Sequence, residues 1–312
     1  MMKVLRKIKL IVAGALLTGL ASMSVAVIGS DDVLIVCSGD CEKSRAMISG
    51  FSASLEKQNK NIDVSELVLS NDESANSKLF AQAKSPGLIF AVDYGAAKKV
   101  SAVSKNVPIV VGVARSQSEL KAIPNATGVV VQYPVKTQLD WIKRILPQAR
   151  RVGVIYSTEE NHRWVSEAQV TAQKMGLELI AVRAKTAKDL PYALKDVLSR
   201  VDVLLGVPDS IILSRQTAKA VLLASFRKRI PFVGLSSSWV KAGALYSLDW
   251  DAENIGQQNA RMGSKVLGGS SIASLGVQNP QKIELNINIK TAEYCKLDLS
   301  DQLIADAKQV FN

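Results

Sequence analysis

The chain has 312 residues, of which 47% are hydrophobic and 21% are charged. This composition is typical of a folded protein with one large or two ordinary domains, and it excludes a disordered or low-complexity chain. No heptad pattern is sustained, and glycine and proline occur at ordinary frequency, with 19 and 9 residues, which excludes coiled-coil, collagen-like and proline-rich classes.

The formal net charge of +11 raises the question of a nucleic-acid or acidic membrane partner. Four basic residues lie within residues 1–9, and removing them lowers the net charge from +11 to +7. The remaining basic residues are scattered, and the densest cluster, Arg227 to Arg229, has no interleaved aromatic residues of the kind that stack on bases. We therefore interpret these residues as solvated helix faces and expect no nucleic-acid partner.

The N-terminus has the order of a secretory signal peptide. Its basic start is followed by residues 10–28 without a charge, and small residues near the end of this run form an Ala-x-Ala-like cleavage site. We expect a signal peptide over residues 1–26 and a mature start near Val27, with Ala21 as a second choice. The competing interpretation is an uncleaved membrane anchor. No cysteine follows closely enough for a lipoprotein box, so the sequence predicts a periplasmic protein exported by a cleaved signal peptide.

In an exported protein the three cysteines are exposed to an oxidising compartment. Cys37 and Cys41 are four residues apart, and Cys295 lies far away near the C-terminus. A disulfide between Cys37 and Cys41 is one interpretation, and a small buried side chain at a strand end is the other for Cys37. Two thiols and a single histidine, His162, do not make a zinc site of standard spacing, so we expect no metal.

The first part of the mature chain alternates between strand and helix patterns. Residues 33–36 form an apolar run typical of a parallel strand that is buried on both faces. Apolar residues between 46 and 55 then recur at helical spacing, and residues 62–69 alternate like a second strand. The buried-strand pattern returns at 88–92 and 109–113, each time after a proline or glycine. These segments predict repeated βα units.

A second series begins after Pro134. A helix is expected over 137–146, because its apolar residues fall on one face and Pro147 follows. Amphipathic stretches separate the further predicted strands. This alternation predicts parallel sheets covered by helices on both faces, and the length divides into two such lobes. The strands expected in this series are 152–156, 177–182, 203–207, 232–235 and a short one at 245–248.

The sequence shows no catalytic constellation. A Ser-His-Asp or Cys-His arrangement would need His162, which lies in a charged run that resembles an exposed helix start. The chain contains no P-loop, no Gly-x-Gly-x-x-Gly after a strand, no His-Glu-x-x-His and no EF-hand loop. A thiol enzyme using Cys37 and Cys41 is a third hypothesis, but their spacing differs from the thioredoxin-like motif. We expect no enzyme activity, no catalytic residue and no cofactor.

Five stretches of the chain carry a specific resemblance, namely 125–147, 151–161, 230–245, 254–262 and 285–297. Together they resemble the exported substrate-binding proteins of ABC transporters, which have the type I periplasmic-binding-protein fold. The likeness is to the branch that includes tryptophan- and tyrosine-binding members, and it covers nearly all of the mature chain. One departure is Ser236, where similar proteins often carry an acidic residue.

The resemblance implies an α/β fold of two Rossmann-like lobes with parallel sheets, joined by a three-stranded hinge. The chain would leave the first lobe near Val130, return near Leu248 and cross again near Gln281. The first lobe would contain 27–130 and 248–281, and the second would contain 131–247 and 282–312. A ligand would bind between the lobes and be buried when they close by hinge motion.

In an open parallel sheet, ligand-binding residues follow the carboxyl ends of the strands. The polar residues there also fit helix caps, and the two roles are compatible. The resemblance implies a solute-binding protein that delivers a small molecule, such as an amino acid, to an ABC permease. A sensor of the same fold that signals to a membrane kinase or cyclase is the alternative. The expected ligand-binding residues are Ser38, Asp93, Tyr94, Gly95, Ala96, Tyr156, Ser157, Asp209, Ser237, Asp249 and Trp250.

Within this set, the resemblance suggests separate chemical roles. Asp209 or Asp249 would pair a ligand amine, while hydroxyls and loop amides would receive a carboxylate. Aromatic anchors would be Tyr94, Tyr156 or Trp250.

Overall fold

The computed structural model describes residues 9–11, 32–58, 62–82 and 86–312. The described chain divides into two compact units. Unit 1 contains the chain up to Gln132 together with Trp250–Lys282, and unit 2 contains Tyr133–Asp249 and Ile283–Asn312. The chain therefore passes from one unit to the other three times. Within the described ranges, no helix has the length and apolar character that crossing a membrane requires.

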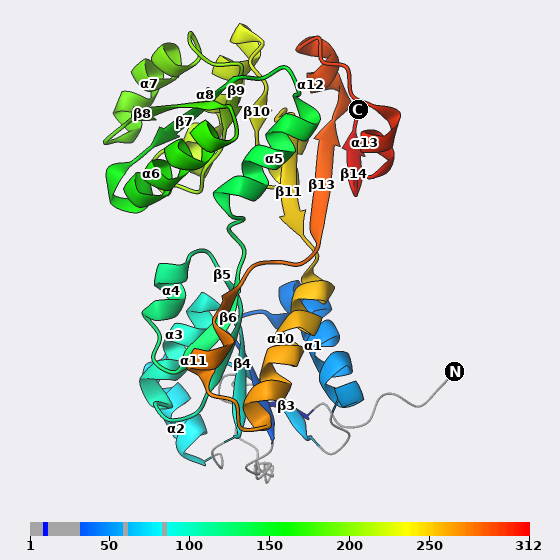
Figure 1. Cartoon of the computed structure of the whole chain (residues 1–312). Coiled ribbons are helices and arrows are strands. Elements are labelled where there is room, and N and C mark those ends of the chain that lie inside the picture. Colours follow the sequence, from blue (N-terminus) through cyan, green and yellow to red (C-terminus); the bar gives the residue numbers. More distant parts are fainter. Residues whose placement is uncertain (1–8, 12–31, 59–61, 83–85) are drawn as a thin grey trace, which may run out of the picture. The chain divides into compact units, whose positions relative to one another are not determined.

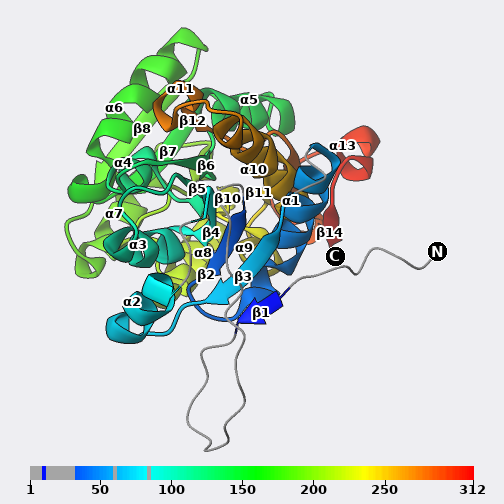
Figure 2. The same ribbon diagram turned by 90° about the horizontal axis from the view of Figure 1, so that it is seen from below.

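Unit 1 is built on a seven-stranded sheet with the order β1-β3-β2-β4-β5-β6-β12, whose strands are labelled in Figures 1 and 2 together. Every neighbouring pair in this order is parallel. The chain goes from β2 to β3 on one side and then to β4 on the other side of β2, so the strand order reverses between β2 and β4. The strands are β1 (Lys9–Ile11), β2 (Val33–Cys37), β3 (Val64–Val68), β4 (Leu88–Asp93), β5 (Ile109–Ala114), β6 (Ala126–Val130) and β12 (Val277–Gln278).

The helices of unit 1 explain why its central strands are continuous apolar runs. Side chains of β2 alternate between two hydrophobic cores, with Leu34 and Val36 in one and Val33 and Ile35 in the other. The first core includes side chains of α3, and the second includes side chains of α1 and α10. The helices are α1 (Arg45–Gln58), α2 (Glu73–Gln82), α3 (Tyr94–Val103), α4 (Gln117–Lys121), α10 (Ala252–Leu267) and α11 (Ile272–Leu275), with a 3₁₀ turn at Cys41–Ser44.

Helices α1 and α10 come from distant parts of the sequence and lie side by side in both views (Figures 1 and 2). Glycine makes their close approach possible. A Cβ atom at Gly50 would lie 2.3 Å from the Glu253 carbonyl oxygen, and one at Gly256 would lie 2.0 Å from the Met47 carbonyl oxygen. The C-terminal segment of unit 1 is thus fastened to the first helix by backbone-to-backbone contact.

Unit 2 has a second seven-stranded sheet, with the order β14-β13-β11-β10-β9-β7-β8. The pairings from β8 through β7, β9 and β10 to β11 are all parallel. Here the strand order reverses between β7 and β9. The strands are β7 (Arg151–Tyr156), β8 (Glu178–Arg183), β9 (Val203–Leu205), β10 (Phe232–Val233), β11 (Tyr246–Trp250), β13 (Ile283–Asn288) and β14 (Gln309–Phe311).

Two cores again flank the sheet of unit 2. One contains apolar residues of α5 and α6, and the other contains residues of α7, α8 and the half-buried Trp239. Trp141 and Trp164 pack against the first core. The helices are α5 (Val135–Ile145), α6 (Thr158–Lys174), α7 (Leu190–Val197), α8 (Arg215–Lys228), α9 (Ser237–Lys241), α12 (Ile289–Tyr294) and α13 (Asp301–Ala305), with a 3₁₀ turn at Ala187–Asp189.

The predicted signal peptide, 1–26, is described only at Lys9–Ile11, the short strand β1 that pairs with β3. The cleavage sites expected near Val27 and Ala21 lie outside the described residues.

Candidate functional site

The reversal of strand order in unit 1 brings two expected ligand residues together. Ser38 directly follows β2, and its hydroxyl donates to both Asp93 carboxylate oxygens at 3.1 and 3.2 Å. Asp93 ends β4 and caps α3, because its Oδ1 accepts the backbone N–H of Ala96 at 2.7 Å. A crevice at such a reversal is where ligands bind in open parallel sheets. The pair formed by Ser38 and Asp93 is therefore the candidate site of unit 1.

The backbone of Gly95 lies close against this pair. A Cβ atom at this position would come within 3.0 Å of Asp93 Oδ1 and 3.4 Å of Ser38 Oγ. A side chain here would crowd both groups, so glycine keeps the space beside them open. Tyr94, the residue between, packs partly against the core beneath α3.

Unit 2 has a similar serine–aspartate pair where its own strand order reverses, between β7 and β9. Ser157 directly follows β7, and both its hydroxyl and its backbone N–H donate to Asp209 Oδ2 at 2.7 Å. Asn161 adds a third bond to the same oxygen, while the backbone N–H groups of Ile211 and Ile212 donate to Oδ1. Burial by itself would raise the pKa of Asp209, but the hydrogen bonds from Ser157, Ile212 and Asn161 hold that pKa below its ordinary value.

The two serine–aspartate pairs differ in how far their carboxylate oxygens are already engaged in hydrogen bonds. Asp209 is buried, and each of its oxygens already accepts at least two hydrogen bonds from its own unit. Asp93 is only partly buried, and among the residues that the structure describes its Oδ2 accepts from Ser38 alone. Within the described chain, no cation forms an ion pair with Asp93. Asp93 thus keeps acceptor capacity that Asp209 has lost.

The remaining expected residues of unit 2 include a second carboxylate that is engaged locally. Asp249 Oδ2 accepts the backbone N–H of Ser237 at the start of α9, and Oδ1 accepts the Ser247 hydroxyl. Asn286 in turn donates to the oxygen of Ser247. This chain of bonds ties β11 to its neighbours.

The expected aromatic anchors at the strand ends are half-buried in their own units. Tyr156, the last residue of β7, packs against the core that contains α5 and α6. Trp250, the last residue of β11, belongs to unit 1 and packs against the core that contains α1 and α10.

A disulfide joins Cys37 to Cys41, with their Cα atoms 5.7 Å apart. Of the two interpretations for Cys37, the structure shows the disulfide. Both cysteines are buried, and the loop that they close contains Ser38. The bridge therefore limits the conformations of the residue that contacts Asp93. Cys295 is the free cysteine of the chain.

We expect removal of this bridge to lower the stability of unit 1. For a loop as short as that between Cys37 and Cys41, chain entropy predicts a loss of about 2 kcal/mol. The measurement is denaturant unfolding of the oxidised protein, of the reduced protein and of the double variant Cys37→Ser/Cys41→Ser. Cys295→Ser is the control and should unfold like the wild type. Equal stability of the oxidised protein and the double variant would contradict the prediction.

Some residues of the candidate site were not expected from the sequence. Asn161 lies about one helical turn after Ser157, so the two side chains are on the same side of α6. Helical spacing could therefore have placed Asn161 near Asp209, the partner of Ser157. The donors at Ile211 and Ile212 are backbone groups, for which no sequence signal exists. In the described part of the chain, no group of three or more His, Cys, Asp or Glu side chains is arranged to hold a metal ion.

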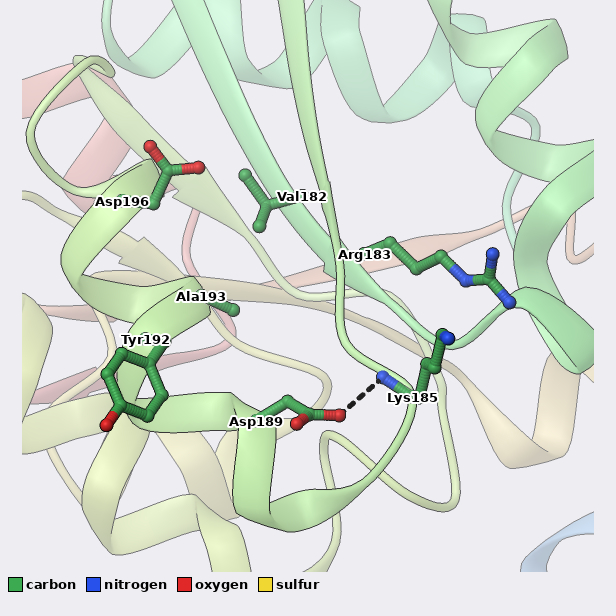
Figure 3. A pocket seen from close by; sticks show the side chains of 7 residues that line it. All are labelled: Val182, Arg183, Lys185, Asp189, Tyr192, Ala193 and Asp196. Carbon is green, nitrogen blue, oxygen red and sulfur yellow. Dashed lines mark hydrogen bonds between the residues drawn. The ribbon is translucent and has the colours of Figure 1, made fainter.

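A pocket of about 500 Å³ lies elsewhere in unit 2, between the end of β8 and α7 (Figure 3). Its walls carry charges of both signs, and Asp189 accepts a hydrogen bond from the Lys185 backbone. This pocket lies at the outer edge of the sheet and not at the reversal point, and it contains none of the expected ligand residues. Its lining residues are Val182, Arg183, Lys185, Asp189, Tyr192, Ala193 and Asp196.

Two α/β units, each with a largely parallel sheet whose strand order reverses once, and three passages of the chain define the class: this is the fold of type I periplasmic binding proteins. A family model described as ABC transporter substrate binding protein matches residues 32–311. The chain belongs to that family.

The chain is also similar to individual relatives and solved structures. The chain is 25% identical to a tyrosine-binding protein of Clostridioides difficile over 262 residues, which is 78% of this chain and 74% of the relative. Among solved structures, it is similar to a ligand-free, open substrate binding protein with adhesive properties from Clostridium difficile, with a TM-score of 0.71 and 20% identity over 90% of this chain and 99% of the other. An ABC domain in complex with L-Trp from Streptococcus pneumonia matches with a TM-score of 0.60, 20% identity and the same coverage.

Proposed function

We propose that this protein is exported, binds a small molecule with a primary ammonium group, such as an α-amino acid, without converting it, and delivers it to an ABC permease. The observation that carries the proposal is the Asp93 carboxylate at the reversal point of unit 1. It is partly buried, it is oriented by Ser38 and Ala96, and it keeps an oxygen with spare acceptor capacity. A carboxylate in such a setting suits a cationic donor.

From the sequence, Asp209 or Asp249 was expected to pair the ammonium group of the ligand. The proposal assigns this role to Asp93 instead. Both are engaged in their own unit, by Ser157 and by Ser237. A ligand ammonium at Asp209 would have to displace bonds that the fold itself uses. The names of the relatives, a tyrosine-binding protein and a protein in complex with L-Trp, support an amino acid as the ligand class.

The test compares matched ligands on the mature protein, residues 27–312. L-tyrosine and L-tryptophan are titrated by calorimetry beside their deaminated and decarboxylated analogues. A ligand that binds only the folded state should also raise the free energy of unfolding, by about 2.7 kcal/mol when its concentration is a hundred times its dissociation constant. We expect the amino acid and the amine to bind better than the deaminated acid.

The variant Asp93→Asn should weaken binding of the amino acid about 30-fold or more, because a charge-assisted pair is lost. Asparagine is a good helix N-cap, so α3 should keep its start and the protein its fold. Affinity for the deaminated acid should hardly change. Asp63→Asn, an exposed carboxylate of unit 1, is the control. Equal losses for both ligands in Asp93→Asn would refute the ammonium contact, and binding of no ligand by the wild type would refute solute capture.

Delivery to a permease is tested in cells. Uptake of the labelled ligand should fall when the gene is deleted, and recover with the wild-type gene but not with Asp93→Asn. Unchanged uptake together with normal binding in vitro would favour the sensor alternative.

A further inference from the structure

An apolar groove lies between α7 and α8 of unit 2, away from the candidate ligand site. Its volume is about 360 Å³. We call it the α7/α8 groove. The residues that line it are Pro191, Leu194, Lys195, Leu198, Ala220, Leu223, Ala224, Arg227 and Lys228.

Six of the nine side chains that line this groove are apolar, and one of them, Leu223, is 42% exposed. In the described part of the chain, five large hydrophobic side chains are exposed, and three of them lie on α7 and α8. These are Tyr192, Leu223 and Phe226, with exposed fractions of 81%, 42% and 49%. Phe226 is also fixed in place, because its ring stacks on Tyr294 with centroids 3.8 Å apart. Of these three side chains only Leu223 lines the groove, because Tyr192 lines the other pocket of unit 2, beside β8, and the ring of Phe226 faces Tyr294.

The charges around the groove have one sign. Its only charged lining residues are Lys195, Arg227 and Lys228, and none of them forms an ion pair within the described chain. Helix α8 carries four basic residues and no acidic one. The basic cluster that the sequence analysis interpreted as a solvated helix face thus borders an apolar surface.

We propose that the α7/α8 groove binds an acidic amphipathic helix of a partner protein. A groove between two helices accepts the apolar face of a third helix, with anchors one helical turn apart. Carboxylates on the borders of that helix would then meet Lys195, Arg227 and Lys228, which form no ion pair with any residue that the structure describes. The groove is concave, which suits a helix better than the flat surface of a membrane. This proposal is independent of the ligand.

The test uses the mature protein and a labelled synthetic peptide of about 18 residues, which is long enough to form a helix. The peptide has leucines at positions i, i+3, i+4 and i+7 and glutamate on the other faces. The comparison probes are a scrambled peptide of the same composition, an analogue with lysine for glutamate, and vesicles of anionic phospholipid. Binding is measured by fluorescence anisotropy at two salt concentrations, and the oligomeric state by sedimentation.

We expect the acidic amphipathic peptide to bind and the scrambled and lysine peptides to bind at least about tenfold more weakly. Leu223→Asp should weaken binding about tenfold, as should Arg227→Glu/Lys228→Glu, and added salt should weaken it in the wild type. Val170→Asp is the control, since Val170 is 53% exposed and lies on α6, whose core is on the other face of the sheet.

Circular dichroism should show that each variant folds like the wild type. The proposal is overturned if Leu223→Asp and Val170→Asp bind the peptide equally, if the scrambled peptide binds as well, or if the groove variants change vesicle binding or self-association and leave peptide binding unchanged.

Discussion

Replacing Asp209 by alanine is expected to destabilise unit 2 by about 3 kcal/mol. The substitution leaves two buried backbone donors, those of Ser157 and Ile212, without a partner, and each such donor costs about 1–3 kcal/mol. It also removes the acceptor that holds the Asn161 side chain at the start of α6. Asp189→Ala is a control, because that carboxylate also accepts backbone N–H groups but makes its hydrogen bonds where water can replace them.

The effect of Asp209 should depend on pH with a definite sign. Hydrogen bonds hold the pKa of Asp209 in the folded protein below its value in the unfolded chain. Its contribution to stability is therefore complete above the unfolded pKa of about 3.9 and is lost as pH falls below that value. The difference in stability between the wild type and Asp209→Asn should shrink over the same range.

Tryptophan fluorescence can follow this unfolding, because Trp141, Trp164 and Trp239 belong to unit 2 and only Trp250 belongs to unit 1. Urea titrations at neutral pH and below pH 4 give the free energies of unfolding. A loss for Asp209→Ala no larger than that for Asp189→Ala, or a difference that grows as pH falls, would contradict the role assigned to the Asp209 carboxylate.

The central strands could be predicted from sequence because they are buried on both faces. The expected strands at 33–36, 88–92 and 109–113 correspond to β2, β4 and β5. In unit 2, the strand expected at 152–156 corresponds to β7. Such strands leave no polar side of the sheet, so their apolar runs stand out against the helices between them.

Other elements gave weaker signals. Strand β6 contains Thr127, whose hydroxyl donates to the Gly276 carbonyl, so a polar residue interrupts its apolar run. Strand β12 has only two residues and exists because it pairs with β6, which no local pattern reveals. Helix α5 begins at Val135, directly after Pro134, and not at the expected position 137.

The candidate site was predictable in part, for a reason of topology. Polar residues that follow parallel strands must gather at one end of the sheet, and this placed Ser38 near Asp93 and Ser157 near Asp209. Sequence patterns do not tell whether a carboxylate at that end is satisfied by its own backbone. The difference between Asp93 and Asp209 depends on loop conformation, which only the structure provides.

Replacing Gly256 by alanine is expected to disrupt the packing of α1 on α10 and to destabilise unit 1 by about 3 kcal/mol. The added Cβ would lie 2.0 Å from the Met47 carbonyl oxygen and 2.7 Å from the Phe51 nitrogen. Both are backbone atoms of a helix, so the neighbour cannot give way by changing a rotamer. Either α10 moves away from α1 or the ends of both helices distort.

Two glycines of unit 1 make a graded control series. Gly263→Ala, also on α10, places its Cβ 2.8 Å from the Leu88 side chain, which can adjust, so we expect a smaller loss. Gly39→Ala meets no atom within 4 Å and should leave stability nearly unchanged. Hydrogen exchange measured peptide by peptide can follow the two units separately, and faster exchange in Gly256→Ala should be confined to unit 1. A loss for Gly256→Ala no larger than that for Gly263→Ala would mean that the two helices separate at little cost, and that their backbone contact does not hold the C-terminal segment of unit 1.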